Sequence, residues 1–258
     1  MGSPRWAPLI HRRASIGGLK PGDHVRQDAV EQRGGHVAQD PNAGTAGGSA
    51  QREYERRRAK DEARIRDTWG QGRIGSIAVA LTPERQSTTA WRGGANGEKE
   101  VGAALDYLAG ESIKVLHDRR IPRSKANIDH IAITPQGVWV VDAKRYKNQR
   151  PALRVDGGIF RPRTELLVVG GRDKTSLIES MYKQVERVRD VVGEVPVRGV
   201  LCFVDADWPL FGGDFVIRGV EVLWPRLLQK RVGAAGDTVC DVAETAATIA
   251  GVFGPALR

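Results

Sequence analysis

The distribution of hydrophobic and polar residues along the chain predicts a mixed α/β protein. Apolar segments of strand length occupy residues 112–118, 197–205 and 220–224, and the last two have the continuous apolar character of strands buried on both faces. Residues 128–144 contain two further apolar segments around a Pro-Gln-Gly turn. Residues 173–193 carry apolar side chains at helical spacing. Helix, then several strands, then helix, strand and helices together indicate a central mixed sheet flanked by helices.

The segments before this pattern predict an appended N-terminal region. Residues 1–50 are rich in Gly, Pro, Asp, Arg and His, so we expect a flexible segment that runs into a linker at 41–51. Residues 52–67 are helix formers with mixed charges three and four positions apart, which indicates either a solvated helix or a basic arm along a phosphate backbone. The sequence SIAVAL at 76–81 predicts a short strand, and residues 91–258 are expected to form the main domain.

The remaining segments of this main domain are shorter. Residues 93–108 begin with loop residues and then become helical in pattern. Residues 153–163 suggest a hairpin around Asp-Gly-Gly, and residues 225–232 and 238–252 suggest two C-terminal helices.

Two acids and a lysine interrupt the apolar segments at 128–144. Asp142 and Lys144 are two positions apart, so their side chains leave the strand on the same face. A two-residue loop places Asp129 directly opposite Asp142, whereas a bulge at Gly137 shifts the register by one, and the sequence allows both. An unpaired carboxylate in an apolar strand costs several kcal/mol, so we expect these acids to be neutralised, paired or bound to a cation.

These residue types support either metal-assisted hydrolysis or a structural ion pair. Two carboxylates and the backbone carbonyl of Ala143 are hard oxygen ligands that suit Mg²⁺ or Mn²⁺. Such a cation can bind a phosphate oxygen and lower the pKa of a water molecule, while Lys144 orients or deprotonates that water or stabilises the phosphate. The alternative is an Asp142–Lys144 ion pair at a strand end, and the spacing alone does not distinguish the two.

The charge distribution favours a polyanionic partner. The chain has 258 residues and a formal net charge of +9. Residues 119–163 contain eleven Lys or Arg against three Asp, a net charge of +8, around the acids expected to be buried. A cationic surface of this kind is required to bind phosphodiesters. The two cysteines lack CxxC spacing and no run of about 18 apolar residues occurs, so we expect no zinc site, no membrane span and a cytoplasmic location.

Four motifs, taken in order, resemble the nuclease-related domain (NERD) family of bacterial proteins, which is similar to the PD-(D/E)xK nuclease superfamily. They are GANGEKEVG from residue 94, LHDRRIPRSKANIDHIAITPQGVWVVDAKRY from 116, KQVERVR from 183 and VLCFVDADWPLFGG from 200. The resemblance extends from about Trp91 to Pro225. It implies a restriction-endonuclease-like α/β core preceded by a basic helical arm.

The resemblance also implies roles for single residues. Glu98 matches the superfamily's helix acid, and Asp129 matches the first strand acid. Asp142 and Lys144 match the acid and the lysine of the second strand. Gln184 matches a helix glutamine that is found in part of the superfamily.

Two of these assignments leave alternatives open, and a third departs from the commoner residue. Glu100 competes with Glu98, since both lie about equally far from the apolar face of their helix and only the resemblance chooses. Asp142 is one methylene shorter than the commoner Glu, which affects how it reaches a metal. Gln184 either lies at the flank of its helix with the amide in water, or acts beside Lys144 as a supporting or DNA-contacting group.

These observations predict a Mg²⁺- or Mn²⁺-dependent nuclease that acts on nucleic acid, with DNA as the expected substrate. Glu98, Asp129 and Asp142 are expected to hold the metal together with the carbonyl of Ala143, and Lys144 to position the attacking water. The alternative is an inactive nucleic-acid-binding module with a nuclease-like fold. The basic residues expected to contact nucleic acid are Arg119, Arg120, Arg123, Lys125, Arg145 and Lys147.

Overall fold

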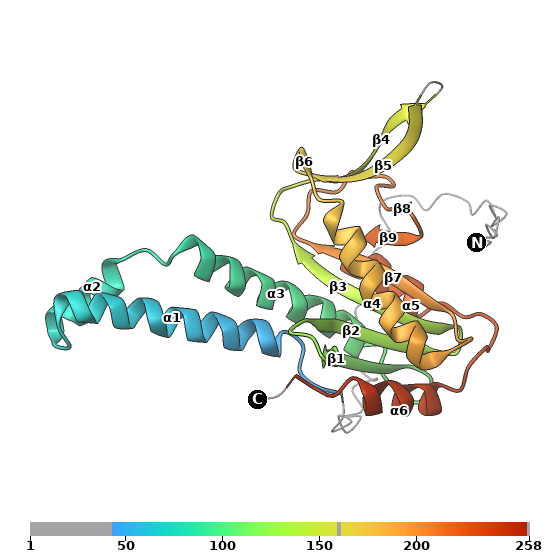
Figure 1. Cartoon of the computed structure of the whole chain (residues 1–258), viewed down its shortest axis with the longest axis horizontal. Coiled ribbons are helices and arrows are strands. Elements are labelled where there is room, and N and C mark those ends of the chain that lie inside the picture. Colours follow the sequence, from blue (N-terminus) through green and yellow to red (C-terminus); the bar gives the residue numbers. More distant parts are fainter. Residues whose placement is uncertain (1–42, 159–160, 257–258) are drawn as a thin grey trace, which may run out of the picture. The chain divides into compact units, whose positions relative to one another are not determined.

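The computed structural model describes residues 43–158 and 161–256, which are built around one six-stranded sheet (Figure 1). The strand order is β1-β2-β3-β7-β9-β8, with β3–β7 and β7–β9 parallel and the other neighbours antiparallel. The expected mixed α/β class, with a central mixed sheet flanked by helices, is confirmed. The elements are α1 (Gly48–Trp69), α2 (Arg73–Leu81), α3 (Gln86–Asp106), β1 (Lys114–Arg120), β2 (Asn127–Thr134), β3 (Gly137–Arg145), β4 (Pro151–Gly158), β5 (Arg161–Val169), β6 (Arg172–Asp173), α4 (Ser176–Val192), β7 (Val197–Val204), β8 (Phe215–Ile217), β9 (Val220–Leu223), α5 (Pro225–Val232) and α6 (Val242–Val252).

The hairpin of β2 and β3 adopts the register of a two-residue loop. Thr134 pairs with Gly137, so only Pro135 and Gln136 lie between the strands and there is no bulge at Gly137. Glycine is required at this position because its φ is 122° and a Cβ would lie 2.4 Å from the carbonyl oxygen of Pro196. The register extends to place Asp129 across from Asp142, which fixes the two acids at one end of the hairpin.

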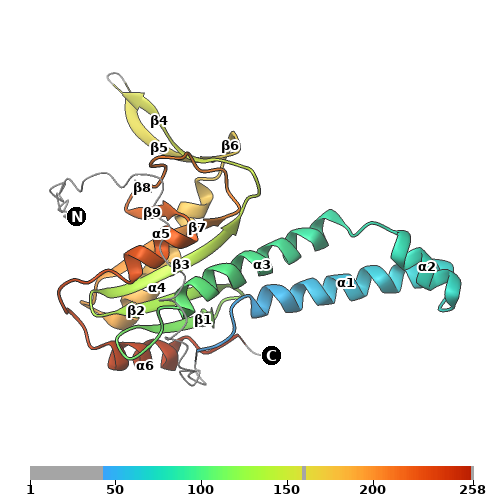
Figure 2. The same ribbon diagram turned by 180° about the vertical axis from the view of Figure 1, so that it is seen from behind.

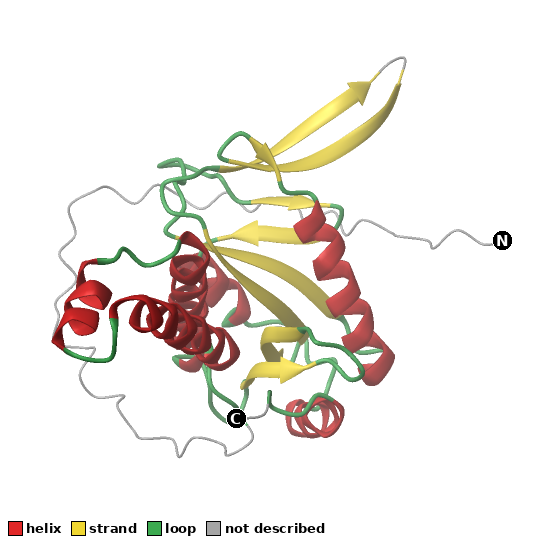
Figure 3. Ribbon diagram, turned by 60° about the vertical axis from the view of Figure 1, so that its left-hand side comes forward, coloured by secondary structure: helices red, strands yellow, loops and turns green. Residues whose placement is uncertain are grey.

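Helices cover both faces of the sheet, and alternation along β3 assigns its residues to one face or the other. Val138 and Val140 pack in the core formed with α4 and α6, whereas Trp139 and Val141 pack in the core formed with α3 and α5. The two helix layers are visible on either side of the strands in Figure 3. Because side chains alternate, Asp142 and Lys144 continue the face that α4 covers.

Helices α1, α2 and α3 form a helical arm, in which α1 lies alongside α3 (Figure 2). The helix predicted at 52–67 is confirmed and extends over Gly48–Trp69. The strand predicted at 76–81 is wrong, because these residues belong to helix α2. In α2 the buried Gly75 and the half-buried Ala78 and Val79 are spaced three and four residues apart, which presents one helix face to α1.

The flexible linker predicted at 41–51 is wrong over its described part. The carbonyl of Ala43 accepts a hydrogen bond from the backbone N–H of His117 at 2.6 Å, and α1 already begins at Gly48. A Cβ on Gly44 would lie 2.3 Å from the carbonyl oxygen of His117, so the segment packs directly on β1. The flexible character predicted for residues 1–42 concerns residues outside the described part of the chain.

Two further predictions have opposite outcomes. Residues 93–97 are helical and belong to α3, which begins at Gln86, so the predicted loop there is wrong. The hairpin predicted at 153–163 is confirmed as β4 and β5, which form a separate three-stranded sheet with β6. Within the described ranges, no helix has the length and hydropathy needed to cross a membrane.

Candidate active site

Three aspartates lie at one level across three neighbouring strands. The register of β1 with β2 sets Asp118 across from Asp129, and the register of β2 with β3 sets Asp129 across from Asp142. The last regular pair of β2 with β3 is His130 with Val141, so the backbone N–H and C=O groups at the level of Asp129 can form hydrogen bonds with side chains. The sheet therefore aligns three aspartate positions at the level where the β2–β3 ladder stops, while β1 and β2 remain paired beyond it.

Short contacts join β2 and β3 at this level. The backbone N–H of Ala143 donates to Oδ2 of Asp129 at 3.0 Å, which uses a donor that the β2–β3 ladder leaves free. The ammonium group of Lys144 donates to Oδ1 of Asp142, whose side chain is buried. The ion pair of Asp142 with Lys144, which the sequence left open as the alternative to a metal site, is present, and it lies near the carboxyl groups of Asp129 and Glu98.

Helix α3 contributes the fourth carboxyl group, that of Glu98. Gly97 brings the helix close to β3, because a Cβ there would lie 3.2 Å from the Cβ of Arg145. Val101 and Leu105, one and two turns further on, are fully buried and hold the helix on the sheet. Glu98 is half-buried beside the aspartates, whereas Glu100 is exposed and its charge acts on Cys202. The structure therefore brings Glu98 to the site.

The crowding of acids changes their proton affinities. Burial, and then the negative charges of Asp118 and Asp142, raises the pKa of Glu98 to about 7. Burial also raises the pKa of Asp129 well above its ordinary value, with Asp142 and Glu98 acting in the same sense. Burial opposes the charge of Lys144, but the carboxylates of Asp142 and Asp129 outweigh it and raise the pKa of Lys144 to about 12.

Asp118 is a site residue that the sequence reasoning missed. Its carboxylate accepts hydrogen bonds from the N–H and the hydroxyl of Ser49, both at 2.7 Å, and from the amide of Asn127 at 3.0 Å. Arg52 of α1 also lies 3.5 Å away. The backbone φ of Asp118 is 50°, in the left-handed region. The signal was an acid in an apolar strand, the same signal that identified Asp129.

The donor set of this site fits a hard divalent cation in its chemistry. Carboxylate oxygens are the ligands that Mg²⁺ and Mn²⁺ prefer, and a cation would offset both the burial and the mutual repulsion that raise the pKa values of Glu98 and Asp129. Over residues 43–158 and 161–256, however, no group of three or more His, Cys, Asp or Glu side chains is already arranged as a ligand set. The ammonium of Lys144 takes one oxygen of Asp142 instead.

Gln184 lies on α4, which covers the same face of the sheet as Asp142 and Lys144. The residue is half-buried, and its Oε1 atom is buried without a hydrogen-bond partner among the residues described. A buried amide oxygen in this state is costly, so it is a candidate to receive a donor from a ligand or a water molecule.

Arg119 is wrong as a predicted phosphate contact. Its side chain is 1% exposed, and its guanidinium group donates to the carbonyl oxygens of Phe253 at 2.7 Å and Ala250 at 3.5 Å. The side chain joins the end of α6 to β1 and cannot reach a polyanion. Sequence reasoning failed here because two adjacent arginines at the end of a strand point to opposite faces, and only one of them faces solvent.

The other predicted nucleic-acid contacts are exposed. Arg120, Arg123 and Lys125 lie at or near the turn between β1 and β2, and Lys147 follows β3. Arg145 is exposed as well, but its guanidinium is already paired with the carboxylate of Asp205 at 2.7 Å.

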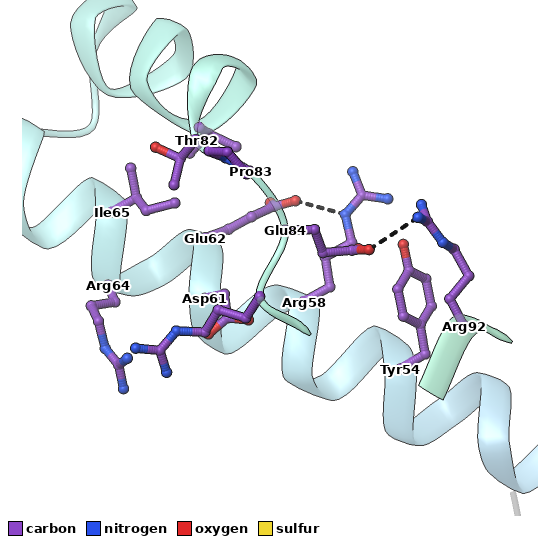
Figure 4. Close-up of a pocket in the computed structure, with 12 residues that line it drawn as sticks. Tyr54, Arg58, Asp61, Glu62, Arg64, Ile65, Thr82, Pro83, Glu84 and Arg92 are labelled. Carbon is purple, nitrogen blue, oxygen red and sulfur yellow. Dashed lines mark hydrogen bonds and ion pairs between the residues drawn. The ribbon is translucent and has the colours of Figure 1, made fainter. Parts of the chain in front are cut away.

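A cavity of about 440 Å³ lies in the helical arm, between α1 and the segment that joins α2 to α3 (Figure 4). None of the carboxyl groups described above lines it. Its charged side chains pair with one another, Arg58 with Glu62 and Arg92 with Glu84. The cavity is therefore a feature of arm packing, separate from the acids on the sheet.

The comparison with known families agrees with the position of this site. The model of the nuclease-related domain matches residues 93–204. That range includes Glu98, the three aspartates, Lys144 and Gln184. No curated protein and no solved structure gives a match to the chain.

Proposed function

Since residues 93–204 match the model of the nuclease-related domain, we propose that this chain hydrolyses phosphodiester bonds in nucleic acid, with DNA as its substrate. The observation that carries the proposal is the group formed by Glu98, Asp129, Asp142 and Lys144 at the level where the β2–β3 ladder ends. Asp142 alone suffices to pair with Lys144, yet Asp129 and Glu98 also lie within the electrostatic reach of the same ammonium group. Such an excess of carboxyl groups over bases favours a cation-binding site over a purely structural ion pair.

Glu98, Asp129 and Asp142 would hold Mg²⁺ or Mn²⁺ together with the carbonyl of Ala143. When bound, the cation supplies a Lewis acid for a phosphate oxygen and a more acidic water molecule. The N–H of Ala143 already fixes one oxygen of Asp129, so this carboxylate is oriented before any ligand arrives.

Lys144 would act as a fixed positive charge. The carboxylates around Lys144 raise its pKa to about 12 in the protein without a bound cation, so the ammonium group keeps its proton there near neutral pH. It therefore donates hydrogen bonds, to the attacking water or to a phosphate oxygen, and stabilises the negative charge that develops there. Asp142 holds the ammonium group in place through the contact described above.

Cleavage assays on linear and circular DNA, with and without Mg²⁺ or Mn²⁺, test this proposal. Lys144→Ala and Asp129→Asn are expected to lower the cleavage rate by about a hundredfold or more, because each removes a charged group from the reacting centre. Glu98→Gln should behave similarly, while Glu100→Gln, an exposed acid two residues away on the same helix, should cleave like the wild type. Full cation-dependent cleavage by folded Lys144→Ala and Asp129→Asn proteins would contradict the assignment.

A second candidate function is an inactive nucleic-acid-binding module. It is favoured by the contact of Lys144 with Asp142 and by the absence of a ready-made ligand set among the described residues. This candidate predicts salt-sensitive binding of DNA or RNA by the wild type and no turnover with either cation. The same cleavage assay separates the two functions.

A further inference from the structure

The two-stranded ribbon of β4 and β5 has a buried root and an exposed outer half. Leu167 and Val169 of β5 are fully buried in the main core, so the root is part of the folded domain. Residues 154–158 and 161–164, in the outer half, are exposed without exception, so both faces of the ribbon are open there. Figures 1 and 3 show the pair of strands as a separate element.

The buried half of the ribbon is fixed at the end of the sheet where the acids lie. The ribbon follows β3 after a connection of residues 146–150. In this connection the N–H groups of Tyr146 and Asn148 donate to the carbonyls of Val204 and Asp205, at 3.2 and 2.9 Å. These carbonyls lie at the C-terminal end of β7, the strand beside Lys144. The ribbon therefore starts beside the candidate active site and is held there by backbone bonds.

The outer half presents positive charge on one face. Arg161 and Arg163 are two positions apart on β5, so their side chains leave the strand on the same face. Both are exposed, and among the described residues neither has an acidic partner or a hydrogen-bond acceptor. Arg154, in contrast, is paired with Asp156 at 3.2 Å. The guanidinium groups of Arg161 and Arg163 are thus available to phosphates or base edges.

We propose that this ribbon enters the major groove of double-stranded DNA, with Arg161 and Arg163 contacting the duplex beside the cleavage site. Two strands about 4.8 Å apart fit a B-form major groove about 12 Å wide. The deep, narrow major groove of A-form RNA excludes such a ribbon, so the fit selects duplex DNA. The inference rests on the proposed nucleic-acid function, and it names the form of nucleic acid and the element that recognises it.

Binding measured without cleavage tests the ribbon directly. The full-length Lys144→Ala protein and the same protein carrying Arg161→Ala with Arg163→Ala are titrated, in chelator, with a fluorescent DNA duplex, the matching single strand and a matching RNA duplex. Loss of both arginines is expected to weaken duplex-DNA binding by about tenfold or more and to lower the slope of log K against log salt by about two. Affinity for the single strand and the RNA duplex should change by less than about twofold.

The control removes the same charge from another surface. Lys183→Ala with Arg187→Ala deletes two exposed cations of α4 and should leave the preference for duplex DNA unchanged. Unchanged duplex-DNA affinity in the ribbon variant overturns the proposal, as does an equal loss for all three nucleic acids. The binding assay does not depend on cleavage, so the two proposals can fail separately. If the ribbon variant binds duplex DNA more weakly but the wild type never cleaves DNA, the ribbon proposal holds and the nuclease proposal fails. If the wild type cleaves DNA but the ribbon variant binds duplex DNA normally, the nuclease proposal holds and the ribbon proposal fails.

Discussion

At the scale of single residues, Asp118 connects the helical arm to the candidate site. Its carboxylate receives the N–H and hydroxyl of Ser49 at the start of α1, and its charge also raises the pKa of Glu98. One side chain therefore caps a helix and adds to the negative field around the other acids. Its strained backbone, with φ at 50°, fits a position that the surrounding contacts hold in place.

Asp118→Ala is expected to destabilise the protein by about 3 kcal/mol, because several donors that share a charged acceptor lose it at once. Asp118→Asn keeps an acceptor and tolerates the left-handed backbone, so it should cost only about 1 kcal/mol. Asp237→Ala, a change at an exposed aspartate, is the control and should have little effect. Urea unfolding measures the three free energies, and an alanine variant at position 118 as stable as the wild type would show that the contacts carry no stability.

Part of the site could be predicted from the sequence because it is local. Asp129, Asp142 and Lys144 lie on one hairpin, and only the loop length separated the two possible registers. Asp118 could not be assigned in the same way, because its partner Ser49 is 69 positions away and lies in a segment that the composition suggested was flexible. Local spacing carries no information about such a contact.

At the scale of elements, helix α3 shows how glycine serves two different purposes. Gly94 has no atom within 4 Å of the position where a Cβ would lie, so it only lowers the helix propensity. Gly102 is buried, and a Cβ there would lie 2.4 Å from the Cβ of Ala46. The absence of a side chain at Gly102 is what lets the segment before α1 pack on the helix.

The two glycines predict alanine substitutions of opposite sign. Gly94→Ala should stabilise the protein by about 0.5 to 1 kcal/mol, because alanine is the better helix former. Gly102→Ala should destabilise it by about 1 to 3 kcal/mol, because the new methyl group forces Ala46 and its backbone to move. Thermal unfolding of both variants checks the signs, and a stabilising Gly102→Ala would mean that residues 43–47 do not pack as described.

Element prediction failed where short segments depend on a distant partner. SIAVAL is apolar and short enough for a strand, and only its packing on α1 shows that it is helical. Residues 93–97 contain glycines that usually indicate a loop, yet they lie inside α3, where Gly97 permits the close approach to Arg145. Long periodic segments such as α4 were predictable, because their own pattern specifies both the type and the buried face.

At the scale of the whole molecule, the charges are divided between an acidic interior and a basic surface. The chain carries 40 Lys or Arg and 31 Asp or Glu, yet Glu98, Asp129 and Asp142 lie around Lys144. A basic surface attracts a polyanion, and a group of buried carboxyl groups attracts cations. The cost is repulsion within the folded protein, which should appear as a dependence of stability on pH.

In chelator, the stability of the wild type relative to Glu98→Gln should fall as pH rises from 5 to 7. The pKa of Glu98 is 4.5 in the unfolded chain and about 7 in the folded protein, so between these values the folded state keeps a proton that the unfolded state has released. The loss is about 1.4 kcal/mol per pH unit, and it is absent from the glutamine variant. The difference in unfolding free energy between the two proteins is the quantity to measure. Burial lowers the pKa of His130, which adds a pH dependence of opposite sign, and the difference cancels it because both proteins contain His130. Urea titrations along this range measure this difference, with Glu100→Gln as the exposed control.

Under the proposed function, Mg²⁺ or Mn²⁺ at pH 8 should stabilise the wild type more than Glu98→Gln. A difference that does not change with pH would mean that neither burial nor the charges of the aspartates raise the pKa of Glu98 as described.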